Sequence, residues 1–348
     1  MRARLMKFYS AAGRRVAALA VILLALVAGR PAFAWNDEGH MAVAYVAYQR
    51  LTPASRKRVT ALLKRNPNYS KWLAVMPKDT PQADVDRTVF VIAATWPDEI
   101  RSDPVYVDDG PNGGNSPAGP DATRNIGYAD HLRHKYWHFI DIFYSEDGTP
   151  LPPVPTPNAE TQIAAFRTAL RSSKSDDIKA YDLVWLEHLV GDIHQPLHAA
   201  TGVSKSLPHG DAGGSFVLLC TAPCGNSLHW FWDRLLGSQS SISLPPGPPP
   251  GPNPGVPGNL MAEVQSATSA AKTLPAADKS LAGKMDGAIW VQESFDLAKQ
   301  YVYAPPIGVG PGPFTMTTAY FETAKRVARE RIALAGARLA NLLNQELQ

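Results

Sequence analysis

Two pairs of histidine and aspartate stand four residues apart in segments that are rich in large apolar side chains. His188 and Asp192 lie in WLEHLVGDIHQPLH, and His229 and Asp233 lie in LHWFWD. A separation of four residues puts both members of a pair on the same face of a helix. Histidine and aspartate are zinc ligands, and hydrolytic sites often gather several metal ions. One such pair alone is more often an ion pair on a helix surface, so the repetition of the pattern favours a metal site.

The apolar neighbours of the first pair indicate that it faces the protein interior. Tyr181, Val184 and Trp185 share the helix face of His188 and Asp192. A buried histidine and aspartate without partners would cost free energy, and a metal ion removes that cost for both.

Three further residues could join these pairs in a metal site. Pro196 ends the helix and lets His198 approach from the next turn. Asp98 in TWPDEI and His138 in KYWHFID are also flanked by large apolar side chains. The sequence therefore predicts a buried site that holds more than one metal ion.

The elements that must position these residues are mainly helical, and we expect an all-α fold. Helices are expected over residues 52–65, over 159–172 after Asn158, over 175–193 and, as one or two long surface helices, over about 317–347. Thr52, Asn158 and Ser175 are favourable N-cap residues, and the two acids after Ser175 suit a first helical turn. Residues 215–219 are the best strand candidate.

Two segments are expected to be loops because of their composition. Residues 103–127 are rich in Gly, Pro, Asn and Asp, and residues 244–258 read LPPGPPPGPNPGVPG. The proline-rich run could bind a partner as a polyproline helix, although a solvated spacer is the commoner outcome. No internal repeat is visible, so we expect one helical domain over residues 35–348 with two long Pro/Gly-rich loop insertions.

Residues 1–34 have the organisation of a secretory signal peptide. Basic residues precede the apolar run VAALAVILLALVAG, and Ala32-Phe33-Ala34 forms a small-x-small cleavage site. The run is shorter than the ~20 residues of a membrane span, so an uncleaved anchor is the less favoured alternative. Cleavage after Ala34 would make Trp35 the first residue of an exported protein, periplasmic or secreted.

The predicted signal contains six of the 34 Lys and Arg residues and none of the 31 Asp and Glu residues. The remaining 314 residues would carry 28 basic and 31 acidic side chains, a formal charge of −3. A chain of this sign lacks the basic face with which proteins coat nucleic acid.

Cys220 and Cys224 are the only cysteines in the sequence. In an exported chain we expect a local disulfide between them, with two free thiols as the alternative. A cysteine zinc site is less favoured because no second cysteine pair exists to complete it.

The order of several short segments along the chain resembles one enzyme family. The segments WNDEGH, ATWPDEI, KYWHFID, EHLVGDIHQPLHA, LHWFWD and GARLANLLN span nearly all of residues 35–348. Together they are similar to the zinc-dependent single-strand nucleases and 3′-nucleotidases of the S-one/P-one class, which share their fold with bacterial zinc phospholipase C. The resemblance implies an all-α fold of that type, hydrolysis of single-stranded DNA and RNA to 5′-nucleotides, and action on 3′-nucleotides.

The resemblance also implies three zinc ions with defined ligands. The α-amine and carbonyl oxygen of Trp35 would bind the first zinc with His40 and Asp192, and Asp192 would bridge to the second. The implied ligands are Asp98, His138, His188 and Asp192 for the second zinc, and His198, His229 and Asp233 for the third. The remaining histidines, His131, His134, His194 and His209, match no ligand position and are expected at the surface or next to the ligands.

Catalytic and substrate-binding roles follow from the same resemblance. A water between the two close zinc ions would lose its proton and attack phosphorus, while the third zinc stabilises the leaving 3′ oxygen. Asp98 would orient that water, and Arg101 stands where family members often have lysine. Arginine keeps the charge and can bind phosphate through two nitrogens.

The nucleobase pocket is implied in the same way. Phe139 would stack on a base, Asp141 would bind the edge of that base, and Ser215 stands where the family's Gly-Gly-Asn has asparagine. Stacking requires an unpaired base, so a preference for single strands is expected.

Two alternative functions remain open on these residues. The first is a zinc phospholipase C on the same scaffold, although the Phe139/Asp141 pair and the spacing from His198 to His229 favour the nuclease. The second is a non-catalytic periplasmic protein that binds zinc or adheres through the proline-rich loop. The leading hypothesis predicts single-stranded DNA, RNA and 3′-nucleotides as substrates, a monomer, and no stable membrane association after signal cleavage.

Overall fold

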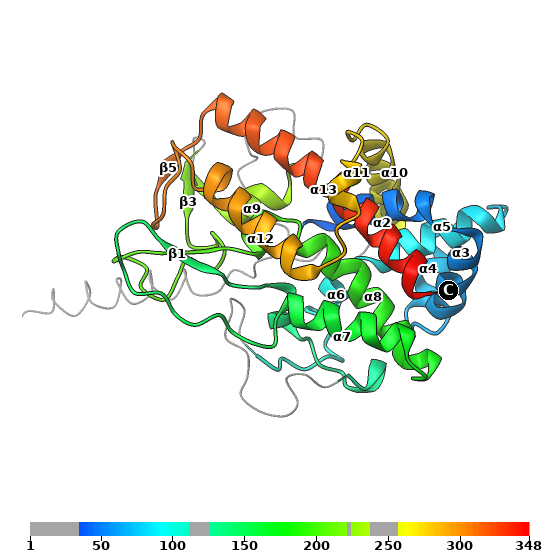
Figure 1. The fold of residues 1–348 in the computed structure, drawn as a ribbon. Coiled ribbons are helices and arrows are strands. Elements are labelled where there is room, and N and C mark those ends of the chain that lie inside the picture. Colours follow the sequence, from blue (N-terminus) through cyan, green and yellow to red (C-terminus); the bar gives the residue numbers. More distant parts are fainter. Residues whose placement is uncertain (1–34, 111–124, 221–223, 237–256, 348) are drawn as a thin grey trace, which may run out of the picture. The chain divides into compact units, whose positions relative to one another are not determined.

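Helices form most of the chain that the computed structural model describes, as the all-α prediction requires (Figure 1). The described residues are 35–110, 125–220, 224–236 and 257–347, and they lie in one structural unit, Ala32–Gln348. The predicted signal peptide, the centre of the first predicted loop and most of the proline-rich loop lie outside these residues. Within the described ranges, no helix is both long and apolar enough to cross a lipid bilayer.

The helices occur along the whole described chain. The α-helices are α2 (Asp37–Arg50), α3 (Pro53–Leu63), α4 (Tyr69–Ala74), α5 (Gln82–Ala93), α6 (Trp96–Glu99), α7 (Ala159–Arg171), α8 (Asp176–Asp192), α9 (Leu228–Asp233), α10 (Pro257–Ala271), α11 (Lys279–Ala282), α12 (Gly287–Leu297) and α13 (Thr318–Glu346). Short 3-10 helices are η2 (Gly127–Ala129), η3 (Lys135–His138) and η4 (Pro196–His198), and η5 (Ala298–Val302) is a π-helix.

The strands within the described residues are short and form two small sheets. In one sheet β1 (Phe143–Ser145) pairs in parallel with β2 (Thr201–Val203). In the other, β3 (Leu218–Cys220) lies between the antiparallel β4 (Cys224–Ser227) and the parallel β5 (Phe314–Thr315). The predicted strand therefore exists, but it starts later because Ser215 belongs to a turn. The register puts Cys220 opposite Cys224, which is compatible with the predicted disulfide; the bond itself stays a prediction.

Three helices begin at the predicted caps. The side-chain oxygens of Thr52, Asn158 and Ser175 each accept a hydrogen bond from a backbone N–H three residues further on. These bonds satisfy donors that the first helical turn leaves without an intrahelical partner. The predicted helices that follow these caps are therefore confirmed as α3, α7 and α8.

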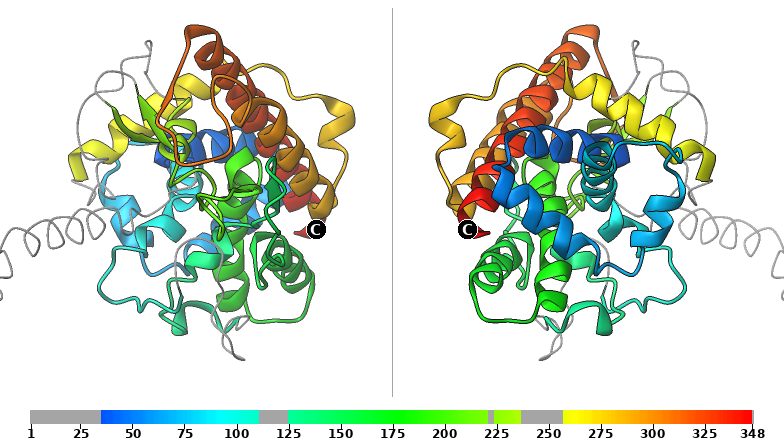
Figure 2. Two further views of the ribbon diagram at one scale, coloured as in Figure 1. Left: turned by 90° about the vertical axis from the view of Figure 1, so that its left-hand side faces the viewer. Right: turned by 90° about the vertical axis from the view of Figure 1, so that its right-hand side faces the viewer.

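Helix α8 carries the first His/Asp pair through the middle of the core. Every residue from Ala180 to Asp192 is buried, and the helix packs against α7, α3, α6, α2 and α13. A helix that is buried all round needs a neighbour on each side. The other helices provide these neighbours, as the two views in Figure 2 show.

The C-terminal helix is not the surface element that was expected. One continuous helix, α13, packs closely on α2, and a Cβ atom added at Gly336 would lie 2.6 Å from Val46 Cβ. Two of its charged residues, Arg331 and Arg338, are only 4% and 0% exposed. The prediction failed because charged side chains at helical spacing normally indicate a solvated face, whereas these two are paired inside the protein.

The buried arginines of α13 hold the C-terminal end of α8. Arg338 binds both carboxylate oxygens of Glu293, at 2.7 and 2.9 Å, and Arg331 binds the same carboxylate at 3.0 Å. His194, also expected as a surface or ligand-adjacent residue, is fully buried; its Nδ1 donates to Val190 O and its Nε2 accepts from Arg338. Because His194 follows Asp192 closely in sequence, this network fixes the backbone that leaves the first His/Asp pair.

His131 and His209 lie at the surface, as expected. His134, in contrast, is buried. Its two ring nitrogens lie 2.8 Å from carboxylate oxygens of Asp109 and Asp130, and its ring stacks on Trp137. The two carboxylates, which hydrogen-bond the ring and oppose the effect of burial, raise the pKa of His134. The network joins the segment of Asp109 to the residues that lead into η3, which carries His138.

Replacing Arg338 with methionine should lower the free energy of unfolding by about 3–5 kcal/mol, because the buried His194 ring and the partly buried Glu293 carboxylate both lose this partner. Arg326→Met is the matched control on the same helix: Arg326 pairs with Glu330, and both side chains are half exposed. That variant should lose about 0–1 kcal/mol. Urea unfolding followed by tryptophan fluorescence measures both, and equal losses would contradict the role given to Arg338.

Candidate metal centre

All nine predicted metal ligands lie in the described part of the chain, and each is at most 5% exposed. They are Trp35 just before α2, His40 in α2, Asp98 in α6, His138 in η3, His188 and Asp192 in α8, His198 in η4, and His229 and Asp233 in α9. Three triplets have ligand atoms close enough to hold a metal ion: His40–Asp98–His188, His138–His188–Asp192 and His198–His229–Asp233. The structure thus brings together residues from six different elements.

Asp192 lies at the middle of this arrangement. Its Oδ1 is 3.3 Å from Nε2 of His40, and its Oδ2 is 3.1 Å from Nδ1 of His138 and 3.3 Å from Nε2 of His188. His198 Nδ1 lies 3.9 Å from Oδ1. With different imidazoles facing its two oxygens, this carboxylate has the geometry of a bridge between two metal positions.

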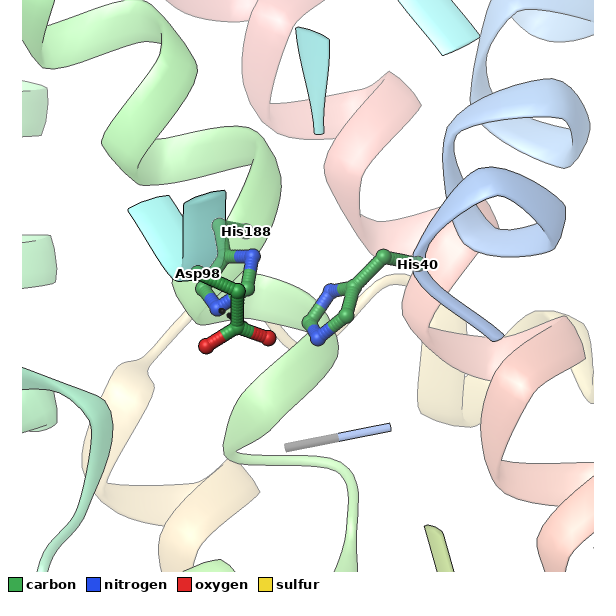
Figure 3. A group of neighbouring side chains, drawn as sticks. All are labelled: His40, Asp98 and His188. Atoms are coloured by element: carbon green, nitrogen blue, oxygen red, sulfur yellow. Dashed lines mark ion pairs between the residues drawn. The ribbon is translucent and has the colours of Figure 1, made fainter. Parts of the chain in front are cut away.

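Asp98 closes the same region from the side of α6 (Figure 3). Its Oδ1 is 3.8 Å from His138 Nδ1, and its Oδ2 is 3.9 Å from His188 Nε2. The His40 ring stacks on the His188 ring with 3.8 Å between centroids, so both imidazoles face the Asp98 carboxylate together. Asp98 therefore fits either of the two positions next to Asp192.

A second His/Asp group lies where η4 meets α9. His229 Nε2 is 3.4 Å from Asp233 Oδ2, and the rings of His198 and His229 are 5.0 Å apart. Gln195 donates from Nε2 to Asp233 Oδ1 at 2.8 Å and so orients that carboxylate. We call His198, His229 and Asp233 the third group. Helix α8 ends at Asp192, before Pro196, and η4 delivers His198.

Backbone carbonyls orient three of the histidines. The acceptors are Ala94 O for His188, His138 O for His198 and Gly213 O for His229, at 2.7, 2.8 and 2.6 Å from Nδ1. A carbonyl can only accept, so Nδ1 carries the proton and Nε2 is left with its lone pair. This is the arrangement in which metal-binding histidines are usually held.

Several buried polar atoms of the centre have no hydrogen-bond partner in the described part of the chain. Both ring nitrogens of His40, Nε2 of His138 and Oδ1 of Asp192 are in this state. Such atoms are costly to bury, and a bound cation accounts for those that face the centre. The residues present therefore fit a metal ion.

Burial also sets the protonation of the centre. It lowers the pKa of His40 and His138 well below the ordinary imidazole value, and it raises the pKa of Asp192 and Asp233 well above the ordinary carboxyl value. Neutral imidazole is the form that binds metal, and a metal cation favours the ionised carboxylate. A bound cation would offset the free-energy cost of ionising Asp192 and Asp233 in the interior.

Trp35 is fully buried and is tied to both parts of the centre. Its indole Nε1 donates to Gly191 O at 3.0 Å, next to Asp192, and the following residue, Asn36, donates its N–H to Asp233 O at 3.1 Å. The first residue of the predicted mature chain thus lies against α8 and α9.

The predicted catalytic and substrate residues surround the ligands. Arg101 is buried and donates to Asp98 Oδ1 at 3.1 Å. Phe139 is 5% exposed, and its ring lies 4.9 Å from that of His198 and 6.5 Å from that of His229. An aromatic face therefore lies beside the third group.

Asp141 and Ser215 are the other two predicted substrate residues. Asp141 is buried, and its Oδ1 accepts a hydrogen bond of 2.5 Å from Thr201. Burial raises the pKa of Asp141. Oδ2 of Asp141 and Oγ of Ser215 are both buried and make no hydrogen bond within the described ranges.

Sequence reasoning missed residues that shape the centre without joining it. Gly191 lets α2 approach α8, because a Cβ atom there would lie 2.9 Å from His40 Nδ1. Gln195 fixes Asp233, and Thr201 fixes Asp141. Gly191 and Gln195 stand inside the segment EHLVGDIHQPLHA, which was the available signal, whereas Thr201 lies outside every recognised segment.

Comparison with known proteins gives a family for this arrangement. The family model described as S1/P1 nuclease matches residues 35–348. Endonuclease 5 of Arabidopsis thaliana is 28% identical over 178 residues, which cover 50% of this chain and 55% of the relative. Endonuclease 2 of the same plant is 26% identical over 192 residues, or 54% of this chain and 59% of the relative. The chain thus spans less than two thirds of the length of these curated relatives.

Asp192→Asn should release metal from two positions, since this carboxylate faces three imidazoles, whereas His229→Ala should release it from the third group alone. Asp182→Asn is the matched control, because Asp182 is another buried aspartate of α8 that lies in none of the triplets. Elemental analysis of the purified variants gives the metal content. Equal metal loss in Asp192→Asn and His229→Ala would count against the bridging position of Asp192.

Proposed function

This chain belongs to the S1/P1 nuclease family, and on that basis we propose that it is a zinc-dependent phosphoesterase that hydrolyses single-stranded DNA and RNA to 5′-nucleotides. We include 3′-nucleotidase activity in the proposal. The observation that carries it is the presence of three buried His/Asp triplets. Two of them share His188 and lie around Asp192, and the other is the third group. Imidazole with carboxylate is a donor set that suits zinc, and the proposal assigns three zinc ions.

Bound zinc ions would supply positive charge to the scissile phosphate and lower the pKa of a water molecule at the centre. The chain's own residues position the reactants. Asp98 belongs to one of the two triplets that share His188 and lies close to His138 of the other. Its carboxylate can therefore accept a hydrogen bond from the attacking water. Arg101, bound to Asp98 Oδ1, keeps a guanidinium beside the centre that can bind a phosphate oxygen.

Base recognition is assigned to Phe139 and Asp141. The Phe139 ring lies beside His198 and His229, so a nucleotide whose 3′ oxygen meets the third group would place its base near this ring. Asp141 Oδ2 is available to accept from a base N–H group. The side chain of Ser215 is shorter than that of the asparagine found in the family, and we assign its Oγ to the same pocket.

Export completes the proposal. We infer that residues 1–34 are removed and that the protein acts as a monomer in the periplasm or outside the cell, without stable membrane association. We include the predicted Cys220–Cys224 disulfide in this setting, since such bonds persist in oxidising compartments.

Single-stranded DNA and RNA should be cleaved much faster than duplex DNA, and added chelator should abolish the reaction. Phe139→Ala should raise the Michaelis constant on oligonucleotides by about 5- to 150-fold, which is the equivalent of losing a stacking contact of about 1–3 kcal/mol. Zinc content should not change.

Two substrates serve as controls for this experiment. A small phosphodiester without a nucleobase should be hydrolysed equally well by wild type and Phe139→Ala; an equal loss on both substrates would make Phe139 a structural residue. Phosphatidylcholine should not be hydrolysed, and preference for it over single-stranded DNA would indicate the phospholipase alternative.

The free α-amine of Trp35 should itself bind zinc after signal cleavage. A protein that keeps one extra residue before Trp35 moves this amine away from the centre, so it should hold about two zinc ions and lose most activity. Mass spectrometry verifies the amino terminus, and elemental analysis counts the metal. Three zinc ions and full activity in the extended protein would refute this ligand.

A further inference from the structure

The third group is held by an unusual turn. Gly210, Ala212, Gly213 and Gly214 all have positive φ angles, of 96°, 52°, 58° and 80°. Left-handed backbone is unfavourable for a residue with a side chain, so Ala212 needs the surrounding structure to hold it there. Such strained segments are common at functional sites.

The turn is in direct contact with a proposed zinc ligand. Gly213 O accepts the hydrogen bond from His229 Nδ1 at 2.6 Å, and this bond orients the imidazole. A Cβ atom at Gly213 would lie 2.5 Å from Leu197 O and 3.3 Å from His229 Nδ1. The position of the Gly213 peptide therefore decides where His229 points.

Gly213 also connects the third group with Asp141, through its N–H group. Gly213 N donates to Thr201 Oγ1 at 3.1 Å, and Thr201 Oγ1 donates to Asp141 Oδ1. Hydrogen bonds on the two sides of Gly213 thus link the carboxylate assigned to the base with the histidine assigned to the third zinc.

Asp211 holds this turn in place. It is fully buried, and its Oδ1 accepts from the N–H groups of Gly202 at 3.1 Å and Gly214 at 2.9 Å. Its Oδ2 accepts from the hydroxyl of Tyr303 at 2.8 Å. Tyr303 directly follows the π-helix η5, so a remote element anchors the carboxylate. π-helical turns occur frequently at functional sites.

We propose that Asp211, anchored by Tyr303, is a positioning residue for the third zinc: it fixes the Gly213 turn whose carbonyl orients His229. This inference rests on the proposed function, because it takes His198, His229 and Asp233 as zinc ligands. Asp211 touches neither metal nor substrate and acts only through the turn.

The experiment titrates metal-free protein with zinc by calorimetry and compares the affinity of each of the three binding events. Asp211→Ala removes all three hydrogen bonds, Asp211→Asn keeps an acceptor for the two N–H groups, and Tyr303→Phe removes a single bond. Tyr144→Phe is the matched control: Tyr144 lies beside Tyr303 with ring centroids 5.3 Å apart, and its buried hydroxyl makes no hydrogen bond in the described part of the chain. His229→Ala identifies the third event by its absence.

Asp211→Ala should weaken the third zinc by about 10- to 100-fold, as loss of a residue that supports a ligand commonly does. Tyr303→Phe should weaken it by about 2- to 10-fold, the effect of one hydrogen bond. Asp211→Asn should restore most of the affinity lost in Asp211→Ala. The first two zinc ions should bind all variants as tightly as they bind the wild type.

Three results would overturn the proposal. Equal third-zinc affinity in Tyr303→Phe and Tyr144→Phe would show that the anchor is irrelevant. Parallel weakening of all three zinc ions would show a general loss of folding instead of positioning. A wild-type protein that binds only two zinc ions would overturn this inference together with the three-zinc assignment, whereas the first two results leave that assignment intact.

Discussion

The cost of burying the Asp192 carboxylate is the constraint on which the rest of this structure depends. The side chain is fully buried and is surrounded by the imidazoles of His40, His138 and His188, whose neutral forms burial favours. Neutral rings do not compensate a negative charge in the interior, so the site needs cations to keep the carboxylate ionised. The fold accordingly places α8 at its centre and covers it with the elements that provide the other ligands.

Two features give the site a defined geometry: the close packing of α2 on α8 and α13, and backbone carbonyls that accept hydrogen bonds from the histidines. Gly191 and Gly336 remove the side chains that would keep α2 away from α8 and α13, and α2 then delivers His40. Carbonyl oxygens from distant segments fix the proton on Nδ1 of His188, His198 and His229. These are backbone contacts, so the orientation of each ring depends on the path of the chain as much as on the residue itself.

Three helix starts and the first His/Asp pair were predictable from the sequence because their signals are local, whereas the full ligand set was implied by the family resemblance and stays a prediction. Thr52, Asn158 and Ser175 cap helices through contacts within four residues, and the pair His188/Asp192 is read from one helical turn. The burial of α13 was not predictable, since Arg331 and Arg338 find their partner Glu293 on another helix. Asp211 was missed for the same reason: its anchor, Tyr303, is 92 residues away in sequence.

Electrostatics also connect the proposed centre with the charge of the whole chain. With the predicted signal removed, 31 acidic side chains exceed 28 basic ones, so the surface gives a polyanion little general attraction. Under the proposed function, the positive charge that attracts a phosphate would be concentrated at the zinc ions held by Asp98, Asp192 and Asp233, with Arg101 beside them. Such a distribution would favour a substrate that brings one phosphate to the centre and one unpaired base to Phe139. It would give no comparable advantage to a duplex, which is bound through many phosphates at once.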